Sequence, residues 1–257
     1  MIETPRQWWT RKLLLGANLA APAALLATRF QQPLVIAAVF GIHTAFASAV
    51  MRPQCGWFGP VVTRFQPRGQ ELWLTIDDGP AAAESEALAA GLQRRGVRAT
   101  FFVKGRNLAA QPAIAQRLVA AGHTLANHTD THPSALFAWL SPARLRHEIA
   151  ACNAALHAAG ITVTRWFRSP VGLKHARLHP LLRQLQMRLV AWTIRGGDGF
   201  RADPATVAAH LVRQARPGAI ILLHEGRPRS NETILRSVDA LLERGFIFVI
   251  PDDAQLA

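Results

Sequence analysis

Cysteines and acidic residues are scarce in this chain of 257 residues. The two cysteines, Cys55 and Cys152, lie far apart and form no CxxC pattern, so cysteine usage leaves the cellular compartment open. Cys152 falls on the stripe Leu145, Ile149, Cys152 and Leu156. This spacing predicts the buried face of a helix, with Cys152 as a small apolar side chain.

The shortage of acids leaves the chain strongly basic, with 29 Lys and Arg against 16 Asp and Glu and a net charge of +13. Before Glu71 the only acidic residue is Glu3. A basic balance favours anionic partners such as phospholipid headgroups or phosphorylated substrates. The sequence has no dense Lys/Arg run and no alternation of basic and aromatic residues, so we expect no nucleic-acid partner. It also lacks internal repeats and low-complexity tracts.

Two charge-free apolar runs, residues 13–28 and 34–51, lie near the N-terminus on either side of Arg29. Basic and tryptophan residues between positions 6 and 12 form a flank suited to lipid headgroups. We therefore expect residues 1–53 to form a helical hairpin that attaches the chain to a membrane through residues 13–51, in a bacterium the inner membrane. Residues 54–69 would be a linker and residues 70–257 the main domain.

Two other interpretations of the apolar runs stay open. Ala47-Ser48-Ala49 resembles a signal-peptide cleavage site, although the preceding apolar region is long and interrupted by Arg29. The runs could also form a soluble helical hairpin packed on the domain. For a membrane hairpin, the basic residues at both of its ends favour a domain on the cytoplasmic side.

From residue 70 onward, apolar strand-like runs alternate with helical patterns, which is typical of a parallel α/β architecture, open sheet or barrel. Seven strands are expected, at Leu72–Ile76, Ala99–Val103, Thr124–Asn127, Val163–Phe167, Leu189–Ile194, Ala219–Leu223 and Phe246–Ile250. Helices are expected between them, near residues 84–95, 111–121, 141–159, 178–187, 204–215 and 231–244.

The candidate reactive side chains all follow the C-terminal ends of these strands. They are Asp77, Asp78, His128, His132, Arg168, Asp198 and His224. In a β/α barrel the carboxyl ends of the strands converge on one face, where active sites are built. The sequence therefore predicts one site that these strand ends share.

The segment NHTDTHP places His128 and His132 four residues apart, so both imidazoles can reach one metal ion if the segment turns helically. Two histidines and one carboxylate are a familiar open zinc set. If Asp78 is that carboxylate, Asp77 remains free to accept a proton from a metal-bound water attacking a carbonyl carbon. The cation would also offset the repulsion between the two adjacent acids.

Four segments, TIDDGP, GHTLANHTDTHP, FRSPVG and AIILLHE, resemble in order and spacing the polysaccharide deacetylases of carbohydrate esterase family 4. The resemblance covers about residues 70–250. It implies a distorted seven-stranded (β/α) barrel following the apolar helical hairpin, and a hydrolase acting on carbon–nitrogen bonds. Members of this family usually act outside the cytoplasm, which opposes the side that the hairpin charges favour.

The resemblance also implies a role for each residue. Asp77 would be the general base, with Arg168 orienting it, and His224 the general acid, with Asp198 tuning it. Asp78, His128 and His132 would bind a divalent metal, Zn²⁺ first and Co²⁺, Mn²⁺ or Ni²⁺ as alternatives. Pro170 and Val171 would border the oxyanion, Val171 through its backbone N–H. The sequence departs from the family at Ser169, Val171 and IRGGDG, where proline, an aromatic residue and a following tryptophan are usual.

We therefore expect removal of an N-acyl group, first of all N-acetyl, from an amino sugar or polysaccharide. One alternative is a deformylase or deacetylase of a polyprenyl-phosphate-linked amino sugar, suggested by the apolar tail and the basic charge. Another is a catalytically silent glycan-binding domain. The sugar, the acyl group, the substrate length and the oligomeric state cannot be inferred from the sequence.

Overall fold

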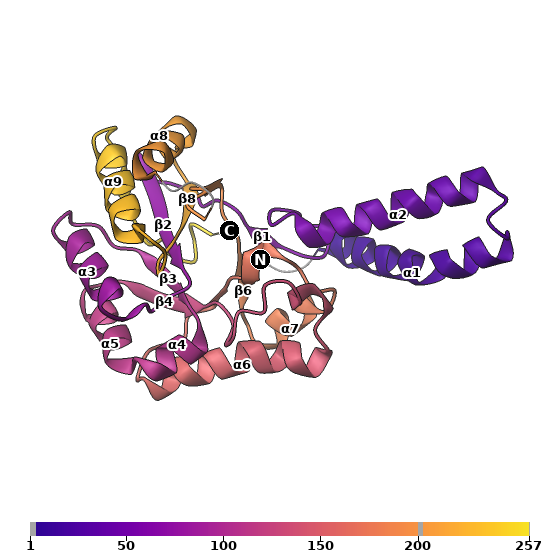
Figure 1. The fold of residues 1–257 in the computed structure, drawn as a ribbon, viewed down its shortest axis with the longest axis horizontal. Coiled ribbons are helices and arrows are strands. Elements are labelled where there is room, and N and C mark those ends of the chain that lie inside the picture. The colour runs from indigo at the N-terminus through magenta and orange to yellow at the C-terminus, as the bar shows by residue number, and fades with distance from the viewer. Residues whose placement is uncertain (1–3, 200–202, 257) are drawn as a thin grey trace.

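The computed structural model describes residues 4–199 and 203–256, and its centre is a curled, parallel β-sheet (Figure 1). Eight strands follow one another in the order β1-β6-β5-β4-β3-β2-β8-β7, and β9 pairs with the first residues of β2. The strands are β1 (Val61–Val62), β2 (Glu71–Asp77), β3 (Thr100–Val103), β4 (Thr124–Asn127), β5 (Trp166–Phe167), β6 (Arg188–Val190), β7 (Ile194–Arg195), β8 (Ala219–His224) and β9 (Ile247–Phe248). The parallel α/β architecture predicted from the sequence is confirmed, and the distorted barrel takes the form of a curled half-barrel.

Helices cover the outer, convex side of this sheet (Figure 1). They are α3 (Ala82–Gln93), α4 (Gly105–Ala110), α5 (Pro112–Ala120), α6 (Pro142–Ala158), α7 (Leu178–Gln184), α8 (Pro204–Gln214) and α9 (Ser230–Leu242). Ser141 caps α6 and Asp203 caps α8, each just before a proline in the first turn, as the sequence predicts. The buried stripe of α6 contains Leu145, Ile149, Cys152 and Leu156, also as predicted.

The central strand β2 shows how the sheet separates a structural face from a chemical one. All seven of its residues are buried. Leu72, Leu74 and Ile76 pack with the helices in the main apolar core, where each contributes about 1.5–3 kcal/mol. Because side chains alternate along a strand, Trp73, Thr75 and Asp77 share the inner face. Polar groups on that face are therefore directed into the half-barrel.

The predicted count of seven strands is wrong because the run Leu189–Ile194 does not form one strand. Val190 in β6 pairs with Val62 in β1, whereas Ile194 in β7 pairs with Ile221 in β8. The chain thus passes within a few residues from β6, next to the edge strand β1, to β7 at the opposite edge of the sheet. The half-barrel is open between β1 and β7. Strand β1 was not among the expected strands. It lies within residues 54–69, where we expected a linker.

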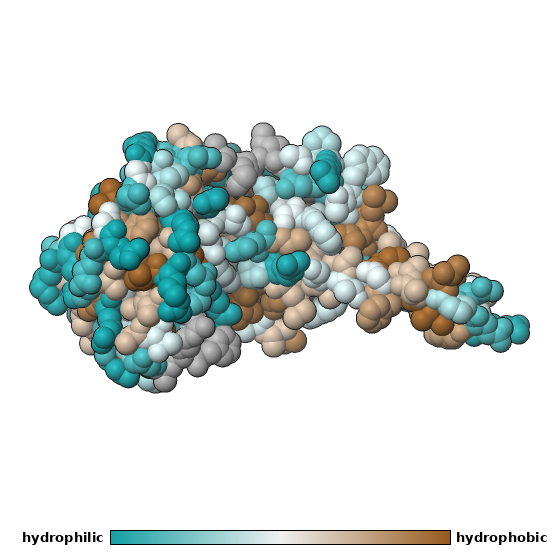
Figure 2. All heavy atoms as spheres, turned by 90° about the horizontal axis from the view of Figure 1, so that it is seen from above, coloured by the Kyte–Doolittle hydropathy of each residue, from teal (hydrophilic) through white to brown (hydrophobic). Residues whose placement is uncertain are grey.

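An N-terminal helical hairpin projects from the half-barrel (Figure 1). It consists of α1 (Pro5–Ala27) and α2 (Pro33–Met51). The helix α1 begins before the apolar run, because Thr4 and Gln7 form a reciprocal capping box. Figure 2 shows hydrophobic residues over much of the hairpin surface and hydrophilic residues at its tip, where Arg29 is exposed.

Within the described residues, α2 is the one helix long and apolar enough to cross a membrane, judged by length and composition. Its 19 residues extend about 28 Å, close to the thickness of a hydrocarbon core. Exposed apolar side chains on this helix include Leu34, Ile36 and Phe40. These features are compatible with membrane attachment.

Candidate active site

Asp77, the last residue of β2, is buried and held by Arg168. The Arg168 guanidinium donates to Asp77 Oδ1 at 2.7 Å and to Thr75 Oγ1 at 2.8 Å. It also donates to the carbonyls of Val190 and Ala191. Because four acceptors surround a fully buried guanidinium, its position is fixed, and the carboxylate of Asp77 is fixed with it.

Asp78 does not follow the alternation expected of adjacent residues in a strand. Its backbone has a φ of 82°, in the left-handed region, and its carboxylate lines the same cleft as that of Asp77. Lys104 Nζ lies 3.5 Å from Asp78 Oδ1, and an Arg227 nitrogen lies 3.3 Å from Oδ2. Burial raises the pKa of Asp78, but electrostatic interactions with His128, Lys104, His132 and His224, whose rings can be protonated at the acidic pH where Asp78 titrates, outweigh it and lower that pKa to about 2. Asp78 is therefore an ionised ligand candidate at neutral pH.

His128 and His132 meet in a loop, not on the helical turn that we expected. Their ring centroids are 4.7 Å apart. Thr129 and His132 both have positive φ values, 67° and 57°. The Asn127 side chain accepts the amide of Thr129, and the Thr129 hydroxyl accepts the amide of His132. These side-chain hydrogen bonds compete with helix formation and favour the looped conformation.

Asp78, His128 and His132 form a set suited to a divalent metal, because one ligand atom from each lies within 4.8 Å of the others. His128 Nδ1 contacts the Arg168 carbonyl at 2.8 Å, and His132 Nδ1 contacts the Ser134 hydroxyl at 2.9 Å. These contacts orient both rings and leave the two Nε2 atoms as ligands. Burial lowers the pKa of His128 and lowers that of His132 to about 4, so both rings are neutral near pH 7. The donor set fits a divalent cation.

His224 and Asp198 form a second pair at the cleft. The Asp198 carboxylate lies 3.0 Å from His224 Nδ1 and accepts the His224 backbone amide at 2.7 Å. The pairing leaves His224 Nε2 as the nitrogen available to a substrate.

The loop after β5 completes the wall of the cleft. Val171 has a φ of 47° and is 55% exposed, and Pro170 beside it is buried. Ser169, where the family resemblance led us to expect proline, is also buried. The cleft is lined by Asp77, Asp78, His128, His132, Val171, Trp192, Arg195, Leu222, His224 and Arg227. Six of the predicted site residues thus line one cleft; Arg168 and Asp198 bind two of those six, and Pro170 precedes another.

Sequence reasoning missed Glu148 in α6, which organises the histidine loop. Its buried carboxylate accepts the amides of Asp130 and Thr131 and the Thr131 hydroxyl, at 3.1, 2.8 and 2.7 Å. Arg144 pairs with it at 2.6 Å. Its position could have indicated this role, because Glu148 lies three residues after Leu145 and therefore on the predicted buried face of the helix. Lys104 was also missed, although it follows strand β3 directly.

Replacing Glu148 with glutamine should weaken metal binding by about 10–100-fold, because the loop carrying both histidines loses part of its support. Zinc titration of the metal-free protein would measure this change. The control is Glu86→Gln, which breaks the exposed Arg117–Glu86 ion pair outside the cleft. Equal zinc affinity in wild type and Glu148→Gln would contradict the proposed support.

Glu225, beside the general-acid candidate His224, lies behind the Asp77-Asp78 turn. A Cβ at Gly79 would come within 1.5 Å of Glu225 Oε1, so a larger residue there would displace the Glu225 carboxylate. Ser85 donates a hydrogen bond to the other carboxylate oxygen. Burial raises the pKa of Glu225 to about 7. This buried acid is packed against the turn that carries the two aspartates.

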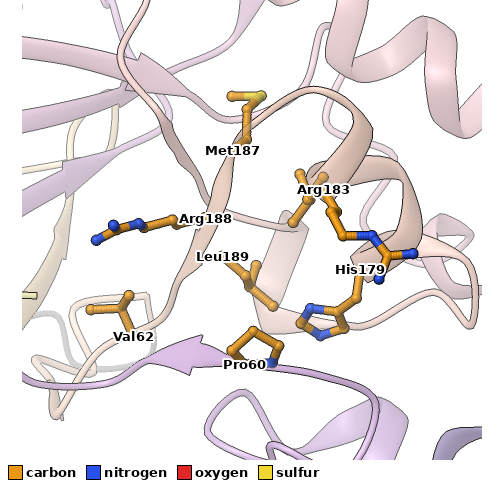
Figure 3. Close-up of a pocket in the computed structure, with 8 residues that line it drawn as sticks. Pro60, Val62, His179, Arg183, Met187, Arg188 and Leu189 are labelled. Carbon is orange, nitrogen blue, oxygen red and sulfur yellow. The ribbon is translucent and has the colours of Figure 1, made fainter. Parts of the chain in front are cut away.

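A separate pocket lies between the segment before β1, the strand β6 and the helix α7 (Figure 3). Its lining includes His179, Arg183 and Arg188 but no carboxylate among the described residues. Burial lowers the pKa of His179 to about 3. A lone, neutral imidazole among apolar and arginine side chains does not form an acid–base or metal set. The chemistry therefore belongs to the cleft at the strand ends.

The fold and the cleft define a class: a parallel α/β half-barrel with a carboxylate–histidine metal set and separate acid and base candidates. A sequence profile of the polysaccharide deacetylase family matches residues 66–190. A chitooligosaccharide deacetylase from Bradyrhizobium is 32% identical over 164 residues, covering 63% of this chain and 74% of the relative. The chain belongs to the polysaccharide deacetylase family, which generally depends on a divalent metal.

Solved structures share the fold. A family 4 carbohydrate esterase from Streptomyces lividans, in complex with acetate, has a TM-score of 0.67 and 27% identity and covers 74% of this chain and 98% of its own. A CE4 family pseudoenzyme from Bacillus anthracis has a TM-score of 0.65 and 28% identity and covers 74% of this chain and 66% of its own. Since the fold also occurs in a pseudoenzyme, activity has to be argued from the side chains of the cleft.

Proposed function

We propose that this protein is a metal-dependent hydrolase that removes an N-acetyl group from an amino sugar of a glycan. The observation that carries the proposal is the convergence of three sets in one cleft: Asp77 with Arg168, Asp78 with the two histidines, and His224 with Asp198. The relatives named as chitooligosaccharide deacetylases support the same reaction. Retention of a buried charged constellation argues against a silent glycan-binding domain.

Asp77 is the proposed general base, and Arg168 is the residue that orients it. Water attacking the amide carbonyl must lose a proton, and a buried carboxylate at the strand end can accept it. Arg168 holds one oxygen of Asp77 at 2.7 Å, which leaves Oδ2 for the water. That free oxygen lies 3.5 Å from His128 Nε2, beside the metal set.

Asp78, His128 and His132 would hold the cation, for which Zn²⁺ is our first choice and Co²⁺, Mn²⁺ and Ni²⁺ are alternatives. When bound, the cation supplies Lewis acidity, which polarises the amide carbonyl and makes water a stronger acid. The backbone N–H of Val171, in the loop after Pro170, would donate to the oxyanion that forms. The apolar side chain of Val171 replaces the ring usual in the family and leaves that wall of the cleft more open.

His224 is the proposed general acid. Amide hydrolysis releases an amine, which leaves only after it is protonated. Asp198, 3.0 Å from Nδ1, holds the ring so that Nε2 can carry the proton to the leaving nitrogen. His224 thus donates a proton to the leaving amine, while Asp77 accepts a proton from the attacking water.

Chelation tests this function directly. Purified full-length protein should release acetate from N-acetylglucosamine oligomers, lose that activity on treatment with a chelator, and regain it with Zn²⁺ or Co²⁺. Metal analysis of the same samples distinguishes metal loss from unfolding. Unchanged acetate release by protein shown to contain no metal would overturn the proposal.

We also propose that residues 1–53 attach the catalytic domain, residues 70–257, to a bacterial inner membrane. The apolar surface of α2 and the basic residues at the base of the hairpin support this attachment. Carbonate washing of membranes should leave the protein in the pellet. A reporter fused after residue 257 identifies the side: the charge distribution favours the cytoplasm, and a periplasmic signal would reject that topology.

A second candidate function is the deacylation of an amino sugar linked to a polyprenyl phosphate. The base of the hairpin contacts the loop that follows Arg168, so the apolar segment and the reaction centre are neighbours. An anionic, membrane-embedded substrate also agrees with the positive charge of the chain. A panel of soluble and lipid-linked N-acyl sugars separates the two candidates.

A further inference from the structure

The base of the hairpin is bonded to both loops that border the cleft. The Lys174 amide donates to the Val50 carbonyl at 3.0 Å, and buried Lys174 Nζ donates to the carbonyls of Arg52 and Pro53. On the other loop, Gln54 Nε2 donates to the Trp192 carbonyl at 2.8 Å. These partly buried contacts hold the segment after α2 against the two loops that border the cleft.

A pocket of about 520 Å³, partly open to solvent, lies at this junction. Its lining includes Ser48 and Met51 from the last turn of α2, Gln54 and Trp57 from the following segment, and Trp192. Trp192 also lines the catalytic cleft. The pocket and the cleft are thus neighbours that share the Trp192 side chain. We call it the hairpin-base pocket.

The chemistry of the hairpin-base pocket favours an anionic, amphipathic ligand. Arg52 contributes an exposed cation, and none of the described lining residues is acidic. Met51 and Trp57 are 66% and 46% exposed and present apolar surface beside that charge. Arginine is well suited to phosphate because its planar fork can form two parallel hydrogen bonds.

The position of the pocket along α2 indicates how the ligand arrives. The candidate spanning helix ends at Met51, and the pocket includes its last turn and Arg52. If α2 crosses a bilayer, the end of its apolar run lies at the headgroup level. The phosphate of a lipid-linked sugar at that level would contact Arg52. The hydrocarbon chain of the lipid would then lie beside α2, and the sugar would be directed toward Trp192.

From these contacts we infer that the hairpin-base pocket binds the phosphate of a lipid-linked amino sugar while the N-acyl group of that sugar enters the catalytic cleft. This inference rests on the proposed deacetylase function. It gives the second candidate function a defined binding site, made, apart from Trp192, by residues that precede the segment matched by the family profile.

The test compares full-length wild type with Arg52→Gln in detergent on three substrates: polyprenyl-phosphate-linked N-acetylglucosamine, N-acetylglucosamine 1-phosphate and an uncharged N-acetylglucosamine oligomer. Arg52→Gln should raise KM for the lipid-linked substrate about tenfold or more, because a charge-assisted hydrogen bond is lost, with kcat unchanged. Its KM for the uncharged oligomer should not change. Arg64→Gln, which removes the same charge from an exposed position outside the pocket, is the control.

A second variant, Trp57→Ala, identifies the source of the phosphate. It should raise KM for the lipid-linked substrate and leave KM for the sugar 1-phosphate unchanged. Equal effects of Arg52→Gln on all substrates, or none on the lipid-linked one, would overturn the inference. Preference of the wild type for the soluble sugar 1-phosphate would also overturn it. Loss of wild-type activity on every substrate would instead reject the deacetylase function.

Discussion

Replacing Asp77 with asparagine should lower kcat by roughly 10²–10⁴-fold, the usual contribution of a positioned general base. Asparagine has nearly the same shape and can still accept the hydrogen bond from Arg168, but it cannot take a proton from water. Asp78, His128 and His132 are unchanged, so the variant should keep its metal. Acetate release and metal content, measured on the same preparation, test both statements.

Loss of the Asp77 charge also leaves buried Arg168 without its counter-ion, which can cost about 3–5 kcal/mol of stability. Thermal unfolding must therefore accompany the kinetics. Asp239→Asn is a suitable control, since it breaks a surface pair with Arg95 away from the cleft. His224→Ala supplies a second kinetic test at a less enclosed position. A folded, metal-containing Asp77→Asn enzyme with wild-type kcat would reject Asp77 as the base.

Replacing His132 with alanine should reduce metal affinity by more than about 100-fold. Loss of a residue that supports a metal ligand typically lowers the affinity 10–100-fold, and loss of a direct ligand should lower it further. Acetate release should fall with metal occupancy. His132 is preferable to His128 for this test, since His128 is almost completely buried and its removal leaves a cavity. Metal content after dialysis is the primary measurement.

The control for this variant is His157→Ala, which removes an exposed imidazole from α6. It should bind metal as the wild type does. His128→Ala, if folded, should behave like His132→Ala, because both rings belong to one set. Stoichiometric metal in either ligand variant would show that the ligand set is wrong, whatever the activity.

Much of the fold could be predicted because the signals are local. Strand β2 and the buried stripe of α6 follow from periodicity, and Ser141 and Asp203 mark helix starts by capping chemistry. The split of residues 189–194 into two strands had no such signal. It depends on pairing with Val62 and Ile221, which are remote in sequence.

In the candidate site, too, some features follow from local sequence signals and others depend on remote contacts. Placement of the reactive groups at strand ends was enough to bring Asp77, His128 and His224 to one cleft. The spacing of the two histidines predicted that they could meet but gave the wrong local conformation. The hydrogen bonds of Asn127 and Thr129, together with the acceptor Glu148 from a later helix, decide the loop instead.

The sequence by itself determined the family, the alternation of strands and helices, and the separate tasks proposed for Asp77 and Asp78. Only the tertiary structure decided that both aspartates face one cleft, because this depends on the left-handed backbone of Asp78. It also placed the hairpin base against the catalytic loops, through contacts such as Gln54 to Trp192, 138 residues away. Periodicity and motifs record what a segment does with its neighbours, whereas packing between remote segments leaves no pattern in either of them.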